Sequence, residues 1–507
     1  MTFNKEKANE HKEWLTNFLP GTYLVNRIAT IPIDGFINKD LIPLLMADNA
    51  RPTPSMVDGL DSGQRKVIFG AFKMMLTADI RVDQFAGYVT ANSAYHHGDQ
   101  RLASTIIGLA QDFVGSNNIN FLLPNGQFGS RVQGGKDAAS PRYIYTALSP
   151  IARRIFHVHD DPLLTYLTDD DTKIEPEWYM PIIPMVLVNG SDGIGTGWSS
   201  NIPNYNPVDI IANIRRLMKG EEQVPMLPWY RGFTGPVVKE SEHRYKTSGV
   251  IEELDESTVR ITELPIRTWT TPYKEQIETW ITGTEKVPSW IKDFRDDSNQ
   301  ARVDLTVTLT QEQLRKAREE GLESKFKLAS TVSTSNMVCF DPQGRIKRYS
   351  SAEEIVQDFF DLRLDYYRKR KEHLTNLFAK QWMRLDNKVQ FLLMVLSGDL
   401  QLNNHQVFII QNLRDNGFEP ESELDPNNNP LADQDGEGPK ARVDNEHDYD
   451  YLLDMPLRRL LHEEVEELKE QRDAKGVELD VFDKTEVDLW NEDLDDFTAA
   501  WEQWLRI

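Results

Sequence analysis

The stretch GGKDAASPRYIY at residues 134–145 joins a flexible run of small residues to an arginine and a tyrosine. Its last residues are β-prone and predict a short strand that carries Arg142 and Tyr143. A tyrosine phenol has an ordinary pKa of about 10, so it becomes a nucleophile only where a cation or base stabilises the phenolate. Arg142 is a permanent cation whose planar fork also suits phosphate oxygens. Such a pair is more often ordinary sheet packing, so this stretch alone does not establish catalysis.

The acidic charge of the chain is concentrated near its end. The 507 residues carry a formal net charge of −23, and residues 401–507 hold 29 acidic and 10 basic side chains. The first 400 residues are therefore nearly neutral and can form local basic patches that bind a polyanion. A chain of this length exceeds the size of one hydrophobic core and predicts about two to four domains.

Cysteine usage and the N-terminal sequence favour a reducing intracellular compartment. Cys339 is the single cysteine and has no intramolecular disulfide partner. Met1 is followed by charged residues that do not resemble a secretory signal. No apolar run approaches the roughly 20 residues that a membrane helix needs. We therefore expect no membrane insertion.

The first 160 residues predict a lead-in at 1–40, followed by a mixed helical and strand domain at 41–160. The lead-in comprises a charged helix at 5–18 and a β-prone piece at 28–33. In the domain, a helix with a basic first turn begins at Gly63. Cations there oppose the helix dipole, which indicates either a nearby anion or a solvated helix end.

A second helix of this domain is expected at 102–113, after the polar turn at 95–99. Glycine-rich strand sequence follows at 121–131 and 142–146. Helices, a turn and then strands form the order of a winged helix-turn-helix, which can lay a helix in a DNA groove.

The remaining sequence predicts an α/β domain at 161–348 and two long helical arms. Frequent strand signals mark the α/β domain, as in 181–188 and 303–309. The arms at 349–396 and 457–507 fit an antiparallel coiled coil, and the first begins at a capping box at Ser351. Between the arms lie apolar helical pieces at 389–400, which overlaps the end of the first arm, and at 407–413, together with an acidic piece at 419–450 that we expect to be disordered. A homodimer contact or an intramolecular cap would cover the apolar helices equally well.

Three shorter motifs have simple structural interpretations. The glycines of 191–198 are followed by Pro203, where a dinucleotide-binding turn would need a helix, so a turn presenting Ile194 is expected instead. Ile194 is then either packed or a wedge between bases. His96 and His97 lack the further ligands of a zinc site, and Asp169-Asp170-Asp171 is typical of a solvated turn.

Taken together, five motifs resemble eukaryotic-type DNA topoisomerase II, and the bacterial gyrase A protein is a more distant match. They are PSMVDGL at 54–60, GQRKV at 63–67, YHHG at 95–98, GGKDAASPRY at 134–143 and DGIGTGW at 192–198. Three further segments extend the resemblance over nearly the whole chain: FINK at 36–39, ELPIRTW at 263–269 and YLLDMP at 451–456. The resemblance implies an α+β multidomain fold with a winged-helix domain, a tower domain at 161–348 and a long coiled coil that ends in a dimer gate at 397–456.

The resemblance also implies the chemistry. Tyr143 would attack a DNA phosphodiester and form a 5′-phosphotyrosine, while Arg142 stabilises the phosphate charge and His97 contacts the same region. The further positions implied for DNA binding are Arg51, Asp58, Arg65, Lys66, Lys136 and Ile194, the last as a wedge.

The family's ATPase region and metal-binding acidic domain are absent from this chain. The chain is accordingly expected to be the breakage-rejoining part of an ATP-hydrolysing type II topoisomerase, incomplete by itself. Its expected partners are double-stranded DNA, a second copy and the missing regions in cis or trans. Mg²⁺ and ATP would bind outside this chain, and the resemblance implies a nuclear location.

One departure from the family pattern favours an alternative function. Asp61-Ser62 stands where the family usually has Lys-Pro, which exchanges a cation near DNA for an anion. Because the metal-binding domain is also missing, a non-catalytic DNA-binding and dimerisation scaffold is the alternative.

Overall fold

The computed structural model divides into two compact units, Met1–Leu364 with Asn491–Ile507, and Asp365–Trp490. It describes residues 10, 13–15, 24, 30–50, 52–95, 98–195, 198–283, 288–400, 405–424, 448–456, 462–480 and 484–506. Within these ranges, no helix combines the length and the apolar character that crossing a membrane requires.

A helical run begins at Ile33, the last residue of the β-prone piece predicted at 28–33; residues 30–32 of that piece are not helical, and residues 28 and 29 lie outside the described residues. It consists of α2 (Ile33–Phe36), η2 (Ile37–Leu41) and α3 (Ile42–Ala50). Pro32 precedes the first turn and its carbonyl accepts a hydrogen bond from the Phe36 amide at 3.0 Å, which starts the helix at Ile33. Of the helix predicted at 5–18, residues 13–15 are helical, and most of the others lie outside the described residues.

Three helices and a two-stranded ribbon follow, of which the sequence predicted the first and the third helix but not the second. The helices are α4 (Ser62–Lys73), α5 (Val82–Asn92) and α6 (Asp99–Ala110), and each packs against the other two. The ribbon pairs β1 (Ile80–Arg81) with β2 (Tyr145–Thr146) in antiparallel register. The strand predicted at 121–131 is wrong: this segment is a loop with isolated bridges from Leu122 and Asn125, held by turn hydrogen bonds such as that from the Gly135 amide to the Ser130 carbonyl.

The segment that was predicted as a strand at 181–188 ends in a helix, α8 (Met185–Asn189). All four residues 185–188 are buried, and an apolar run without periodicity does not distinguish a buried strand from a buried helix. Pro184 is the N-cap residue, and the helix begins directly after it. The neighbouring elements are α7 (Ala152–Ile155), η3 (Val158–Leu163), the hairpin β3 (Tyr166–Asp169) and β4 (Thr172–Pro176), the hairpin β5 (Ser191–Ile194) and β6 (Ser199–Ile202), and α9 (Pro207–Met218).

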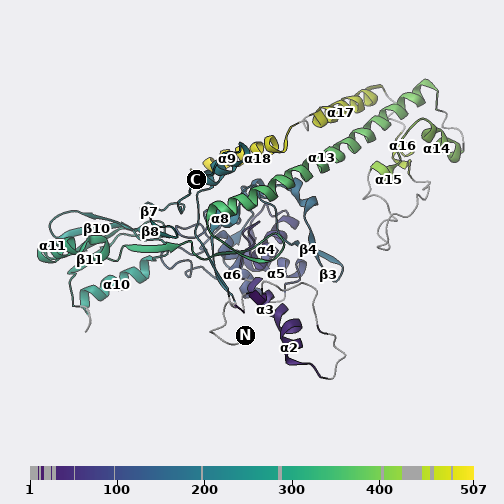
Figure 1. Cartoon of the computed structure of the whole chain (residues 1–507). Coiled ribbons are helices and arrows are strands. Elements are labelled where there is room, and N and C mark those ends of the chain that lie inside the picture. The colour runs from purple at the N-terminus through teal and green to yellow at the C-terminus, as the bar shows by residue number, and fades with distance from the viewer. Residues whose placement is uncertain are drawn as a thin grey trace. The chain divides into compact units, whose positions relative to one another are not determined.

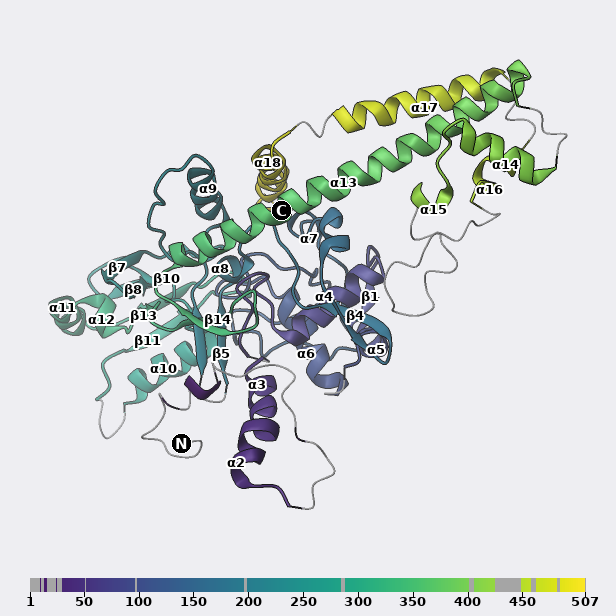
Figure 2. The same ribbon diagram turned by 45° about the vertical axis from the view of Figure 1, so that its right-hand side comes forward.

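An antiparallel four-stranded sheet organises the rest of the first unit. Its order is β11-β12-β10-β9, and helices α10 and α11 contribute Tyr273, Ile277, Trp280 and Leu314 to its core. Figure 2 shows α10 and α11 near the strands β10 and β11. The strand predicted at 303–309 is β12. A three-stranded sheet of order β13-β8-β7 and the pair β14-β15 complete this region. The bounds are β7 (Val237–Ser241), β8 (Arg244–Ser248), β9 (Val250–Glu253), β10 (Thr258–Glu263), α10 (Thr270–Thr282), β11 (Asp293–Asp296), β12 (Leu305–Thr308), α11 (Gln311–Glu320), α12 (Leu322–Lys325), β13 (Ala329–Ser333), β14 (Met337–Phe340) and β15 (Ile346–Tyr349).

The predicted long helix is present as α13 (Ala352–Ser397), a 46-residue element (Figure 1). The Ser351 hydroxyl accepts from the Glu354 amide at 3.2 Å, as a capping box requires. The Glu354 carboxylate, however, accepts from the Ser350 amide instead of the Ser351 amide. The later helices are α14 (Gln406–Asp415), α15 (Glu421–Leu424), α16 (Asp450–Leu453), α17 (His462–Asp480) and α18 (Glu486–Trp504).

In the second unit, α17 runs antiparallel to α13. Arg472 pairs with Asp386 at 3.1 Å, and Lys475 lies over the Phe378 ring. The apolar pieces at 389–400 and 407–413 pack into one core, which also contains Tyr449, Leu452, Val465 and Leu468. They therefore cover much of their own apolar surface. Most of the acidic piece at 419–450 lies outside the described residues.

Candidate functional site

Arg142 and Tyr143 lie in a turn and not in the predicted strand. The Tyr143 amide donates to the Ser140 carbonyl at 2.9 Å, and β2 begins only at Tyr145. Ser140 and Pro141 favour such a turn because both are common turn formers. Ile144 is buried, whereas Tyr143 is 76 % exposed. The phenol is thus presented to solvent on a segment that is anchored by its buried neighbour.

The Arg142 guanidinium is also exposed. In the described part of the chain it makes no hydrogen bond or ion pair. A guanidinium in this state can bind a phosphate bidentately without first breaking an internal contact. The turn therefore presents a phenol and an available cation side by side.

The loop before this turn is tied to the segment at 263–271. Gly134 has a φ of +63°, and a Cβ there would lie 2.3 Å from the Trp269 ring. The amides of Thr270 and Thr271 donate to the carbonyls of Arg131 and Val132 at 3.4 and 3.0 Å. The end of the four-stranded sheet region thus fixes the loop that precedes Tyr143.

A buried ion pair strengthens this connection. Arg131 Nη2 lies 2.5 Å from Glu263 Oε1, and both side chains are nearly inaccessible. Glu263 also accepts from the Leu264 amide at 2.9 Å and from the Thr234 hydroxyl at 3.0 Å. Because the acid has several donors, its charge is satisfied without water.

Asp61 is the N-cap of α4 and supplies the anion that the basic first turn suggested. Its carboxylate accepts from the Gln64 amide at 2.8 Å, and the Gln64 side chain accepts from the Asp61 amide at 3.0 Å. This reciprocal pair is a capping box. Burial raises the pKa of Asp61. The expected helix start at Gly63 is therefore one residue late, and the D-x-x-Q spacing was the signal that it missed.

Asp58, Arg65 and Lys66 form ion pairs within the chain. Asp58 is fully buried; it receives Arg65 Nε at 2.8 Å and the Tyr179 amide at 3.0 Å. Burial lowers the pKa of Arg65, but the Asp58 carboxylate more than offsets this and the pKa lies above its ordinary value. Lys66 pairs with Glu175 at 2.7 Å.

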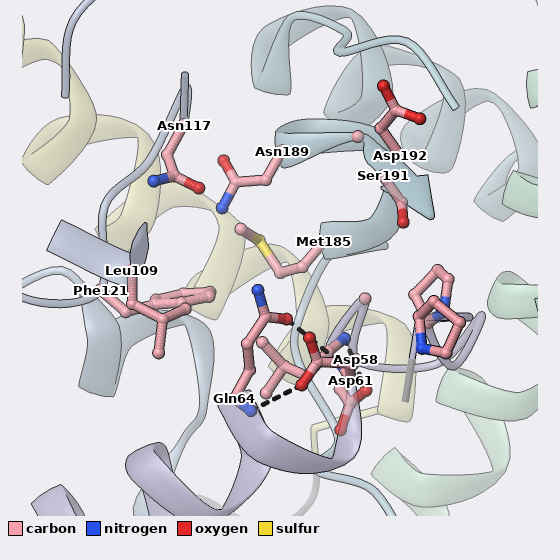
Figure 3. Close-up of a pocket in the computed structure, with 15 residues that line it drawn as sticks. Asp58, Asp61, Gln64, Leu109, Asn117, Phe121, Met185, Asn189, Ser191 and Asp192 are labelled. Atoms are coloured by element: carbon pink, nitrogen blue, oxygen red, sulfur yellow. Dashed lines mark hydrogen bonds between the residues drawn. The ribbon is translucent and has the colours of Figure 1, made fainter. Parts of the chain in front are cut away.

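A polar cavity of about 180 Å³ lies between the start of α4, the end of α8 and the start of β5 (Figure 3). Most polar side chains that line it form hydrogen bonds within the chain. Asn189 exchanges two hydrogen bonds with the backbone of Ile119, and Asn117 donates to the carbonyls of Gly108 and Gln111. Across the described ranges, no three His, Cys, Asp or Glu side chains converge to hold a metal ion.

Ile194 ends the first strand of the β5-β6 hairpin and is 86 % exposed. It is therefore not packed, which was one of the two interpretations of its motif. The hairpin is held from behind, because the Asn201 amide donates to the Asn336 carbonyl at 2.9 Å and Asp192 pairs with Arg267 at 2.5 Å. A strand that is anchored in this way and exposes a large apolar residue can insert it into a partner.

The remaining residues that the sequence singled out differ in where they lie. Lys136 is exposed on the loop before Tyr143. Arg51 and His97 lie outside the described residues. The predicted turn at 169–171 is confirmed, between β3 and β4. Sequence reasoning missed Arg131 and Glu263, because residues 132 positions apart give no local signal.

Comparisons with known proteins agree with this arrangement. The family model for the A protein of DNA gyrase and topoisomerase IV matches residues 51–495, and the C-terminal associated domain of TOPRIM matches residues 1–49. DNA topoisomerase 2 from Candida albicans is 45 % identical over 100 % of this chain and 37 % of its own length. The Arabidopsis thaliana protein is 46 % identical over 99 % and 35 %, and human DNA topoisomerase 2-beta is 44 % identical over 97 % and 32 %.

A solved structure covers the same region. The DNA-binding, cleavage and re-ligation domain of Plasmodium falciparum topoisomerase II matches with a TM-score of 0.90 and 41 % identity, over 100 % of this chain and 69 % of that one. The mixed α and β fold is thus that of a type II topoisomerase cleavage domain. The chain belongs to the family of DNA gyrase and topoisomerase IV A proteins, and its relatives named here are eukaryotic DNA topoisomerase 2 proteins. It spans about a third of the length of those curated relatives.

Proposed function

We propose that this chain is the breakage-rejoining part of a type II DNA topoisomerase that cuts both strands of one duplex to pass another. The exposed Tyr143 beside the available Arg142 is the observation that carries the proposal. The Tyr143 phenol loses its proton as its oxygen attacks a backbone phosphorus and forms a 5′-phosphotyrosine, while the 3′ oxygen leaves and takes up a proton to become a hydroxyl. Attack by that 3′ hydroxyl on the phosphotyrosine reverses the step, because the covalent link to Tyr143 conserves the energy of the phosphodiester bond that was broken. Arg142 stabilises the charge on the transferring phosphate.

The DNA contacts follow from the same resemblance. Lys136 and Ile194 are exposed and available to DNA, Ile194 as a wedge that bends the duplex. Arg65 and Lys66 already have internal partners, so we propose that they shape the start of α4 more than they bind phosphate. Arg51 and His97 remain proposed contacts near the reacting phosphate.

Domain roles complete the proposal. The three helices and ribbon within 41–160 would act as the winged-helix domain, and the sheets within 161–348 as the tower. Helices α13 and α17 would be the coiled-coil arms of a gate. Near its apolar core the second unit exposes Leu393, Leu396, Val407 and Phe408, which a second copy would bury in a homodimer.

The proposed activity requires two cofactors. A divalent cation would assist cleavage as a Lewis acid, and ATP would drive strand passage, both bound outside the described residues. Helices α2 and α3 expose Ile33, Phe36 and Leu44, a surface that a neighbouring metal-binding region would cover. The eukaryotic relatives favour a nuclear location.

A covalent-adduct assay tests the proposal against the alternative, a non-catalytic DNA-binding and dimerisation scaffold, which Asp61 in place of a family cation favours. Supercoiled DNA and Mg²⁺ are incubated with the chain alone and with the chain joined to the metal-binding and ATPase regions. We expect few protein-linked breaks with the chain alone and many with the joined protein. Adducts that persist in Tyr143→Phe would refute the nucleophile, and their absence from the joined wild-type protein would favour the scaffold.

A further inference from the structure

The start of α5 lies directly against the turn that carries Arg142 and Tyr143. The Val82 amide donates to the Ile144 carbonyl at 3.1 Å, and the Asp83 amide donates to the Pro141 carbonyl at 3.3 Å. These two bonds bracket the Arg-Tyr pair. The Asp83 side chain consequently brings a carboxylate into the electrostatic field of Arg142.

The Asp83 carboxylate, however, is already hydrogen-bonded to Arg81. Arg81 Nε and Nη2 donate to the two oxygens of Asp83 at 2.8 and 3.1 Å, and the Gln84 amide donates to Oδ1 at 2.8 Å. The hydrogen bond from Arg81 lowers the pKa of Asp83, and the charge of Arg142 adds to the effect. Asp83 is therefore an anion at neutral pH.

The ion pair has little value as a stabilising contact. Both side chains are about one third exposed, and exposed pairs contribute at most about 1 kcal/mol. Its position beside the proposed nucleophile suggests another role. A carboxylate that is not held by Arg81 would offer Arg142 the same bidentate acceptor geometry as a phosphate. It would then compete with the DNA for that guanidinium.

We propose that Arg81 is a positioning residue: by holding the Asp83 carboxylate it keeps Arg142 open to the scissile phosphate. This inference rests on the proposed function, because it assumes that Arg142 binds that phosphate. It distinguishes Arg81 from a direct DNA contact, since the effect of Arg81 acts entirely through Asp83.

Rescue by a second substitution tests the proposal. Arg81→Ala, Asp83→Asn and the double variant are made in the joined protein, and Tyr143-linked adducts are measured on a duplex oligonucleotide with Mg²⁺. We expect Arg81→Ala to reduce adduct formation about tenfold, because the freed carboxylate engages the cation that stabilises the phosphate. Asp83→Asn should give adducts at or above the wild-type level. The double variant should recover to within about twofold of wild type, because an amide no longer attracts the guanidinium.

The controls separate the possible failures. If the double variant stays as low as Arg81→Ala, Arg81 contacts DNA or the fold directly and the inference is wrong. An unaffected Arg81→Ala variant would also overturn it. Arg295 and Asp297 form an exposed pair with the same sequence spacing in β11 and the loop that follows it, so Arg295→Ala should leave adduct formation unchanged. A wild-type protein that forms no Tyr143-dependent adduct would instead refute the proposed function.

Discussion

Arg131 Nη2 contacts Glu263 Oε1 at 2.5 Å although the two residues are 132 positions apart in the sequence, and both side chains are almost completely buried. The pair joins the loop before Tyr143 to the end of β10. Its removal leaves one charge buried without a partner, which is more costly than the loss of an exposed ion pair.

We therefore expect Glu263→Ala to lower the free energy of unfolding of the first unit by about 3 to 5 kcal/mol. Urea denaturation followed by tryptophan fluorescence measures it. Arg318→Ala, which breaks the exposed pair with Glu253, is the control and should cost at most about 1 kcal/mol. If both variants lose the same free energy of unfolding, burial does not strengthen the Arg131–Glu263 pair.

The sequence predicted local features of the fold better than distant ones. The start of α13 and the alternation in β12 are set by neighbouring residues, and both were found. The strand predicted at 181–188 became α8, because full burial removes the periodicity that separates helix from strand. The motif singled out Tyr143 as a candidate nucleophile, but it could not show the exposure of this side chain, which comes from a turn with Ile144 buried next to it. The positions of Asp83 against this turn and of Glu263 against Arg131 give no local signal, because only the folded chain brings these residues together.

Gly134 is expected to tolerate no side chain. Gly134→Ala places a Cβ 2.3 Å from the Trp269 ring at a φ of +63°, so both strain and overlap should destabilise the loop. Unfolding measurements should show a loss of more than about 2 kcal/mol, and adduct formation should fall with it. Gly220→Ala has a similar φ of +72° but open space around the Cβ, and should cost only about 1 kcal/mol. A Gly134→Ala loss no larger than the control would show that Trp269 moves aside.

The stability contribution of Asp61 should depend on pH. Burial raises its pKa in the folded chain above the ordinary value of 3.8, so deprotonation disfavours the folded state as pH rises through that window. Asp61→Asn keeps an N-cap acceptor without the charge. Its Tm should exceed that of wild type at pH 7, and the difference should shrink near pH 3.5 to 4, roughly the unfolded pKa.

A carboxyl with the opposite shift provides the control for that experiment. The hydrogen bond from Arg260 lowers the pKa of Asp304, so this carboxylate favours the folded state at neutral pH. Asp304→Asn should therefore lower the Tm at pH 7. An Asp61→Asn variant that is less stable than wild type at pH 7 would show that the cap needs the charge.

The proposed homodimer should depend on the exposed apolar residues of α14. Phe408 is 69 % exposed, and Phe408→Glu places a charge on the surface that a second copy would cover. We expect the sedimenting mass to fall from dimer to monomer at micromolar concentration. Val477→Glu alters an exposed apolar residue of α17 and should leave the mass unchanged. A dimeric Phe408→Glu variant would place the interface elsewhere.

The bend that Ile194 introduces into DNA should be separable from affinity. Ile194→Ala removes most of an exposed apolar wedge and no charge, so phosphate contacts remain. On a duplex labelled at both ends, energy transfer should fall towards the value of free DNA, while affinity changes by less than about tenfold. Val158→Ala trims an apolar residue that is 54 % exposed on η3 and should not alter the transfer. If the Ile194→Ala complex bends DNA as much as wild type does, Ile194 is not the wedge, because the alanine methyl group is too small to insert between bases.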